Sequence, residues 1–147
     1  QDRQAIAVSE QLSVSPILVP HRDEYSETVG FQVKGPRKKA IFIPDIDKWD
    51  KWETNIEEAI AGVDYALLDA TFFDGEELPG RNIAEIPHPF VSESLQRFAT
   101  LPLAERNKIY FIHFNHTNPL LIEGSDAEKR VIEAGFHVAR MGMVLAL

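Results

Sequence analysis

The sequence predicts an α/β domain, and three observations support this fold class. Short apolar runs typical of buried strands alternate with segments whose apolar residues recur at helical spacing. The chain has 147 residues, the length of one ordinary domain. Its composition, 44% hydrophobic and 26% charged, is that of a folded globular protein. We therefore expect helices packed on a sheet, with no internal repeat.

The first part of the chain predicts three strands. Residues 15–20 form a short apolar run bounded by prolines, and residues 29–34 alternate between apolar and polar side chains. Residues 39–44 are almost continuously apolar, which is typical of a buried strand. The Gly-Pro-Arg-Lys turn at 35–38 is expected to join the second and third strands into a hairpin.

The middle of the chain alternates helices with strands. Residues 55–61 have helical spacing and end at Gly62, a residue common after helices. Residues 63–70, VDYALLDA, predict a second buried strand. A helix is expected at 89–101 and a third buried strand at 108–114.

The C-terminal region predicts one more helix and a hairpin. The helix begins after Ser125, with Glu128 at the capping-box position, and ends before Gly135. Residues 136–139 and 143–147 then predict two short strands, which we expect to pair as a terminal hairpin.

Charge and cysteine content exclude several classes of function. Fifteen basic against 23 acidic residues give a net charge of −8, which disfavours binding to nucleic acid, and the basic run at 34–39 indicates a solvated turn. No stretch reaches the roughly 18 apolar residues of a membrane span, so we expect no membrane partner. Without cysteine, any metal must be held by histidine and carboxylate side chains. The lack of cysteine fits a soluble protein of the cytoplasm or the periplasm, so the compartment stays open.

Side chains able to bind a metal lie at the ends of the predicted strands. His21 follows the first strand, Asp45 follows the hairpin's second strand, and His113 lies near the end of a third. Asp69 and Thr71 stand at the end of another. Because α/β sheets place their ligands at the rim where strands end, we expect His21, Asp45 and His113 to converge on one ion.

Each candidate also has a purely structural interpretation. His21 could be a hydrogen-bonded rim residue, and Asp45 could belong to an ordinary turn. His113 lies in an apolar segment, where an unpaired imidazole would be costly. His88 stands between two prolines and is held in a stiff loop. The residues we expect to be structural are His116 and Asn118 in an Asx-type turn, His137 in a terminal strand, and the packed Trp49 and Trp52.

Taken in order, these segments resemble the C-terminal half of the metallo-β-lactamase superfamily. The stretches PHRDEYSETVGF, AIFIPD and IYFIHFN are similar to its third, fourth and fifth metal motifs. Within it, the chain most resembles the pyrroloquinoline quinone biosynthesis protein B group, through LLDATFFDGEE and HFNHTNPLL. His116 stands where that group is expected to carry asparagine. The similarity runs from about residue 15 to residue 147.

The resemblance implies a metal-dependent hydrolase. It makes His21 and His113 metal ligands and Asp45 a carboxylate that bridges two metals. His88 would be a general acid or a group that positions a small-molecule substrate, with Asp69 beside it or behind the ligands. Two zinc ions are expected in the complete fold, with iron or manganese also compatible. A metal-bound hydroxide would attack an ester, amide or phosphodiester, with Asp45 and His88 as the catalytic residues.

Other functions stay open at this point. The resemblance to the quinone-biosynthesis group also allows metal-dependent oxidation of a small precursor. A fragment with an incomplete ligand set could instead be a scaffold without a working metal site. Nucleic-acid processing is a third alternative, but it would need a basic appendage that the sequence lacks.

The resemblance covers only part of the superfamily's fold. The signature His-x-His-x-Asp-His, which the superfamily carries in its N-terminal half, is absent from the sequence. The complete fold is an αββα sandwich in which each half supplies a sheet and its helices. We therefore expect residues 1–147 to be one partial domain, a mixed sheet with helices on one face. Its inner face would need cover from a missing N-terminal segment, a second chain or a homodimer. We expect this face to carry Ile17, Val19, Ile41, Ile43, Leu67 and Phe111.

Overall fold

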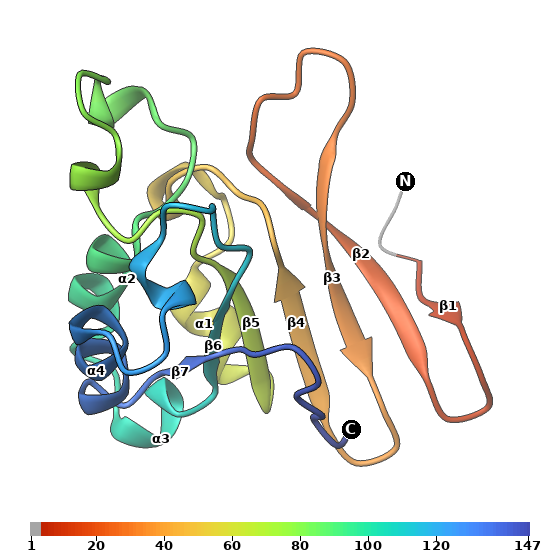
Figure 1. Cartoon of the computed structure of the whole chain (residues 1–147). Coiled ribbons are helices and arrows are strands. Elements are labelled where there is room, and N and C mark those ends of the chain that lie inside the picture. The colour runs from red at the N-terminus through yellow and green to blue at the C-terminus, as the bar shows by residue number, and fades with distance from the viewer. Residues whose placement is uncertain (1–3) are drawn as a thin grey trace.

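A computed structural model describes residues 4–147 and shows a seven-stranded sheet whose strands follow one another in sequence order (Figure 1). The first part of the sheet is antiparallel and consists of β1 (Ile6–Ala7), β2 (Ser13–Val19), β3 (Thr28–Lys34) and β4 (Lys39–Ile43). The second part runs parallel to β4 and consists of β5 (Tyr65–Asp69), β6 (Ile109–Ile112) and β7 (His137–Val138). The predicted mixed sheet is confirmed, as is the turn between β3 and β4, where the Gly35 N–H donates to the Lys38 carbonyl at 2.9 Å.

Four helices connect the strands: α1 (Ile56–Ala61), α2 (Val91–Phe98), α3 (Leu103–Arg106) and α4 (Asp126–Glu133). Single 3-10 turns add η1 (Trp49–Lys51), η2 (Gly75–Glu77), η3 (Ile83–Glu85) and η4 (Pro119–Leu121). Side chains cap two of the predicted helices, α1 and α4, since Asn55 accepts from the Glu58 N–H and Ser125 from the Glu128 N–H. No helix within residues 4–147 is long and apolar enough to cross a bilayer.

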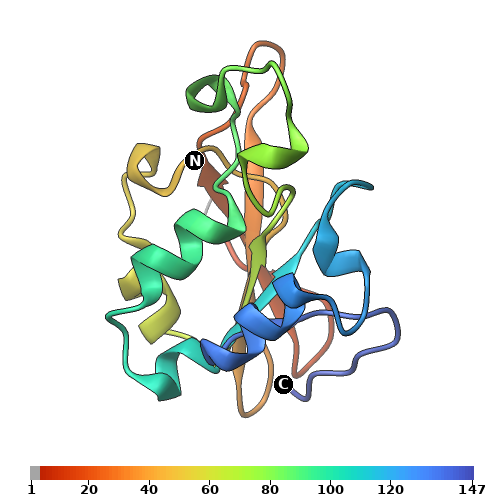
Figure 2. The ribbon, with the colours of Figure 1, turned by 60° about the vertical axis from the view of Figure 1, so that its left-hand side comes forward.

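The helices cover one face of the sheet. Alternate residues of β4, β5 and β6 point to this face and are buried, namely Ile41, Ile43, Ala66, Leu68, Ile109 and Phe111. They share one core cluster with Ile56 and Ile60 of α1, Val91 and Phe98 of α2, and Val131 of α4. Figure 2 shows α1, α2 and α3 together on one side of the strands. The prediction of helices on a single face is confirmed.

The opposite face of the sheet is apolar but only half-buried. Phe42, Leu67 and Tyr110 lie side by side across β4, β5 and β6, and Phe31 of β3 pairs with Phe42. We call these four side chains the open face. No helix of residues 4–147 packs on it; the C-terminal segment 139–147 crosses in front of the sheet (Figure 1).

The expected composition of this face is largely wrong. Leu67 lies on the open face as predicted, but Val19, Ile41, Ile43 and Phe111 are buried in the helix-covered core, and Ile17 packs against that core. Side chains alternate between the two faces of a strand. A continuous apolar run does not reveal which alternate set meets the helices.

The predicted C-terminal hairpin is also wrong. His137 and Val138 form β7, which pairs with β6 in parallel, whereas residues 143–147 form no strand. The chain turns at Gly142, whose φ of 84° suits glycine, and its end runs beside the β3–β4 turn. A Cβ at Gly35 would come within 2.5 Å of Leu147 there. The short β1 and α3 had no counterpart among the predicted elements.

The strand directions bring the candidate residues to one rim. β2 is antiparallel to β3, and β3 is antiparallel to β4, so β2 runs in the same direction as β4, β5 and β6. The carboxyl ends of these four strands therefore lie at the same edge. The loops after β2 and β4 are joined there, because the Asp47 N–H donates to the Pro20 carbonyl at 2.7 Å.

Candidate metal centre

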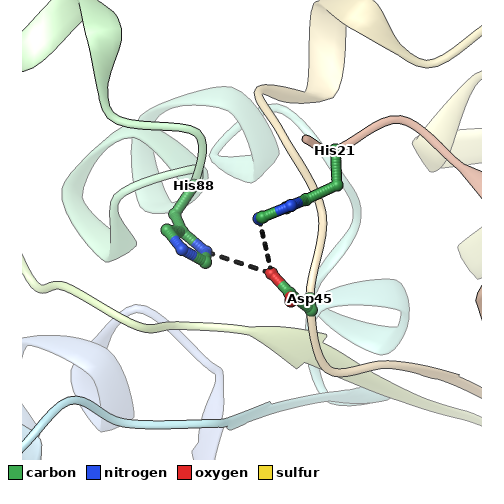
Figure 3. Close-up of side chains that lie close together, drawn as sticks. All are labelled: His21, Asp45 and His88. Carbon is green, nitrogen blue, oxygen red and sulfur yellow. Dashed lines mark ion pairs between the residues drawn. The ribbon is translucent and has the colours of Figure 1, made fainter. Parts of the chain in front are cut away.

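His21, Asp45 and His88 meet at this rim from three separate segments. His21 follows β2, Asp45 follows β4, and His88 lies in the loop before α2. Both imidazole rings point toward the Asp45 carboxylate (Figure 3). Asp45 Oδ1 lies 2.8 Å from His21 Nε2 and 3.5 Å from His88 Nδ1. One potential ligand atom from each residue lies within 4.8 Å of the others, a spacing that one metal ion could span.

Two of these atoms are buried without a hydrogen bond. His21 Nε2 and Asp45 Oδ1 face each other at 2.8 Å, but their geometry is not that of a hydrogen bond and neither has another partner among residues 4–147. Buried polar atoms are nearly always paired in folded proteins, because losing water without a replacement is costly. A cation shared by the nitrogen and the oxygen would satisfy both, so these residues fit a metal.

A second group of candidate ligands consists of Asp45, Asp69 and His113. Asp69 is fully buried at the end of β5, and His113 follows β6 directly. His113 Nδ1 lies 3.7 Å from Asp69 Oδ1, and His88 Nδ1 lies 2.8 Å from Asp69 Oδ2. Asp45 belongs to both groups, and this arrangement is compatible with a carboxylate shared by two ions.

Thr71 lies between Asp69 and the two histidines. Its hydroxyl donates to Asp69 Oδ1 at 2.7 Å, since a carboxylate can only accept. That hydroxyl has one proton, so toward the rings it acts as an acceptor, 3.0 Å from His113 Nδ1 and 3.2 Å from His88 Nδ1. The contact favours the His113 tautomer with its proton on Nδ1, which leaves Nε2 free for a metal.

The charges around Asp69 shift two pKa values. Burial alone would raise the pKa of Asp69, but contacts with His113, His88 and Thr71 outweigh it and hold the pKa below its ordinary value. Asp69 in turn raises the pKa of His113 against the opposing effect of burial, and the charge of Asp45 adds to the rise. Both shifts favour the ionised pair in the metal-free protein.

His113 has an unusual backbone conformation. Its φ is 62°, and it is the one non-glycine residue with positive φ among residues 4–147. A left-handed backbone costs an ordinary residue roughly 1–2 kcal/mol. The following loop is tied to the end of β5, because the Asn115 N–H donates to the Thr71 carbonyl and Asn118 Nδ2 donates to the Ala70 carbonyl. Such strain at a candidate site is compatible with a functional role.

The residues interpreted as structural lie outside both groups, as expected. His137 stacks on Tyr110 with ring centroids 4.6 Å apart, and His116 is exposed. Asn118 accepts from the Leu120 N–H and caps η4. The indole N–H groups of Trp49 and Trp52 donate to Ser94 Oγ and to the Leu18 carbonyl.

Comparison with known proteins defines the class of protein. Residues 1–114 match the family described as Beta-lactamase superfamily domain. The chain belongs to this superfamily, as its motifs predicted.

Its relatives narrow the similarity further. Coenzyme PQQ synthesis protein B of Methylobacterium nodulans is 27% identical over 132 residues, and that of Cupriavidus necator is 25% identical over 134 residues. These alignments cover 84% and 86% of this chain but 42% and 43% of the relatives. The crystal structure of Zn(2+)-bound PqqB from Methylobacterium extorquens aligns with a TM-score of 0.77 at 25% identity. It covers 100% of this chain and 51% of that protein.

The comparisons confirm the predicted resemblance and the fold class. The chain spans about half the length of the relatives that it matches. The zinc ion belongs to the Methylobacterium extorquens structure.

Proposed function

We propose that this chain supplies part of a zinc-dependent catalytic centre, with His21, Asp45 and His113 as ligands. The observation that carries the proposal is the pair of buried, unpaired atoms His21 Nε2 and Asp45 Oδ1 facing each other at 2.8 Å. Imidazole and carboxylate ligands suit zinc, with iron or manganese as alternatives. The zinc-bound relative supports the same metal. Asp45, common to both groups of ligands, is the candidate bridge between two ions.

The reaction we propose is hydrolysis of an ester, amide or phosphodiester. When bound, zinc supplies a Lewis acid and a water molecule of lowered pKa. The chain itself supplies His88, whose Nδ1 lies 2.8 Å from Asp69 Oδ2. A histidine oriented by a buried carboxylate can protonate a leaving group or orient a substrate. Asp69 acts through His88, as a positioning residue.

A metal-dependent oxidation is the second candidate. It is favoured by the relatives, which are named as coenzyme PQQ synthesis proteins. Zinc has no redox chemistry, so the metal separates the two reactions. Cleavage of p-nitrophenyl esters or phosphodiesters by the zinc-loaded protein, lost in His21→Ala, is the result expected for hydrolysis. Zinc binding without any cleavage, together with oxygen uptake that requires iron, would favour oxidation instead.

The proposed centre also needs residues from outside this chain. Its open face is apolar and has no covering helix among the residues described, and the chain spans about half of its relatives. We expect a second sheet to pack on this face. It would belong to the same protein, to another protein chain or to a second copy, and would add the remaining ligands.

Zinc titration tests the ligand assignment. We expect the chain to bind one or two equivalents of zinc by calorimetry, and His21→Ala and Asp45→Ala to weaken binding at least about tenfold. His116→Ala and His137→Ala are matched controls, because both histidines lie outside the two groups, and both should bind like the wild type. Equal binding by all four variants would refute the assignment. No binding by the wild type would leave the scaffold interpretation.

A further inference from the structure

A hollow of about 260 Å³ lies directly beside the candidate metal centre. His21 and His88 belong both to the lining of the hollow and to the candidate metal centre. The other lining residues include Phe72, Ile86, Arg22 and Arg81. Phe72 packs edge-on against His88, with ring centroids 6.0 Å apart. A molecule in the hollow would therefore touch both the histidines and an apolar, aromatic wall.

The guanidinium groups of both arginines at this hollow have no partner among residues 4–147. Among residues 4–147 no hydrogen bond, ion pair or aromatic contact engages the guanidinium group of Arg22 or Arg81. The other arginines of the described chain, apart from Arg37, are occupied: Arg97 by Glu57 and Asp50, Arg140 by Glu128, Arg106 by the Ala134 carbonyl, and Arg130 by the ring of Phe73. Two of the three arginines without a partner in residues 4–147 thus line one small hollow, in a chain of net charge −8.

The chemistry of the lining selects a class of ligand. Guanidinium groups bind carboxylates through paired hydrogen bonds in a fixed plane, and they do so more strongly than neutral donors bind neutral acceptors. The apolar wall of Phe72 and Ile86 favours a flat or aliphatic body over a sugar or a solvated phosphate. The volume lies below the roughly 300–1,000 Å³ of sites for drug-sized ligands, so it suits a ring-sized group.

A larger hollow elsewhere in the molecule is less suited to binding an anion. It measures about 770 Å³ and lies along η1 and α2. Its charged side chains already pair with one another, Arg97 with Glu57 and Lys48 with Glu93. A ligand there would have to displace these ion pairs, whereas Arg22 and Arg81 are free.

We propose that the hollow beside the metal centre binds the carboxylate end of a small aromatic substrate, with Arg22 and Arg81 as the residues that recognise the anion. This inference rests on the proposed function for the location of the reacting bond, which would lie at the His21–His88 wall. The arginine contacts themselves need no metal. The metal-free protein therefore tests the binding step separately from zinc binding and hydrolysis.

Binding of benzoate to the metal-free chain is the experiment. Calorimetry or chemical-shift titration should show benzoate binding, with the neutral isostere benzamide at least about tenfold weaker. Arg22→Gln and Arg81→Gln should each weaken benzoate at least about tenfold, because each removes a charged hydrogen-bond donor. Arg22→Lys and Arg81→Lys keep the charge and should retain more of the binding than the glutamine variants.

Arg37→Gln is the matched control. Arg37 is also exposed and has no side-chain partner among residues 4–147, but it lies in the β3–β4 turn, so its variant should bind benzoate like the wild type. Equal affinity for benzoate and benzamide, or equal losses at Arg37 and Arg81, would overturn the proposal. So would inorganic phosphate binding as tightly as benzoate, which would show an anion site without aromatic selectivity. If the chain binds benzoate as expected but binds no zinc, the proposed function is refuted and the proposed anion site is not.

Discussion

The hydroxyl of Thr71 joins the buried carboxylate of Asp69 to two imidazoles at once. Its proton goes to Asp69, and its oxygen faces Nδ1 of His113 and of His88. Groups behind metal ligands commonly fix the tautomer and direction of the ligands. We therefore regard Thr71 as a positioning residue for both histidines.

Removing this hydroxyl should affect both stability and zinc binding. Thr71→Val removes the hydroxyl that donates to Asp69 Oδ1 and faces Nδ1 of His113, although the backbone N–H of residue 71 still donates to Asp69. Because one hydrogen bond to a buried charged group is lost, we expect a loss of about 1–3 kcal/mol in the free energy of unfolding. Zinc affinity should fall about 10- to 100-fold, as for other residues behind metal ligands. Urea unfolding and zinc calorimetry measure the two effects.

Thr71→Ser is the control for the Thr71 experiment. Serine keeps the hydroxyl and loses only a methyl group, so its zinc affinity should stay near that of the wild type. The nitrogen chemical shifts of His113 add a direct readout, because they distinguish the two tautomers. A valine variant with the wild-type tautomer and zinc affinity would show that Thr71 only fills space.

Some of the candidate site residues could be predicted from the sequence, but their contacts with one another could not. His21, Asp45 and His113 could be chosen because they follow recognisable apolar strands, and strand ends of like direction share a rim. The contact between His88 and Asp69 forms because the long loop before α2 folds back onto the end of β5. No local sequence pattern predicts this contact. The positive φ of His113 is equally invisible, since it arises from the contacts of the loop after β6.

At the scale of elements, α4 is held at its start by two different devices. Ser125 accepts from the Glu128 N–H, as the capping-box spacing predicts. The Glu128 carboxylate, however, accepts from the N–H of Gly124, one residue before the predicted donor, and pairs with Arg140 beyond β7. Glu128 thus ties the helix start to the C-terminal segment.

The contribution of the Glu128 carboxylate to stability should depend on pH. The Gly124 N–H lowers the pKa of Glu128; burial opposes this and Arg140 adds to it, so the folded pKa lies below the ordinary value. Stability from the ionised carboxylate is therefore present at neutral pH and lost as the pH falls through the folded pKa. Glu128→Gln should cost about 1 kcal/mol at neutral pH, and the difference should shrink under acidic conditions, well below the ordinary glutamate pKa of about 4.3.

Glu133→Gln on the same helix is the matched variant, because Glu133 is exposed and near the other end of α4. Its unfolding free energy by urea denaturation should follow the wild type at both pH values. A Glu128→Gln penalty that is the same in acid as at neutral pH would contradict an ionic origin.

The predictions of helices and strands were correct where the local sequence of a segment indicates its structure. The apolar runs of β4, β5 and β6 and the caps of α1 and α4 are local features, and each produced the expected element. The C-terminal segment has similar apolar residues. However, β7 pairs with the edge of β6, and residues 143–147 pair with no strand. Strand pairing is a tertiary property, so it could not be deduced from apolar content alone.

At the scale of the whole molecule, the open face dominates the behaviour that we expect of this chain. Phe31, Phe42, Leu67 and Tyr110 form a half-buried apolar surface, and patches of this kind mark contacts with other chains or domains. That a partial domain has one such face follows from the family resemblance. Which side chains lie on it follows only from the register of the strands.

The open face should cause the isolated chain to self-associate. Leu67→Glu places a charge in the middle of this face, so sedimentation should show association at least about tenfold weaker than in the wild type. Leu103→Glu is the control, because Leu103 is 56% exposed in α3, which lies on the helix-covered side of the sheet (Figure 2). Equal association of the two variants would show that another surface is responsible.

The central claim is that His21 and Asp45 share one zinc ion at the rim of the sheet. Anomalous diffraction at the zinc edge, from crystals grown with zinc, tests it directly. We expect a strong peak between His21 Nε2 and Asp45 Oδ1, and no such peak in crystals of His21→Ala. Zinc found only at other sites, with His21 and Asp45 contacting each other as in the metal-free chain, would contradict it.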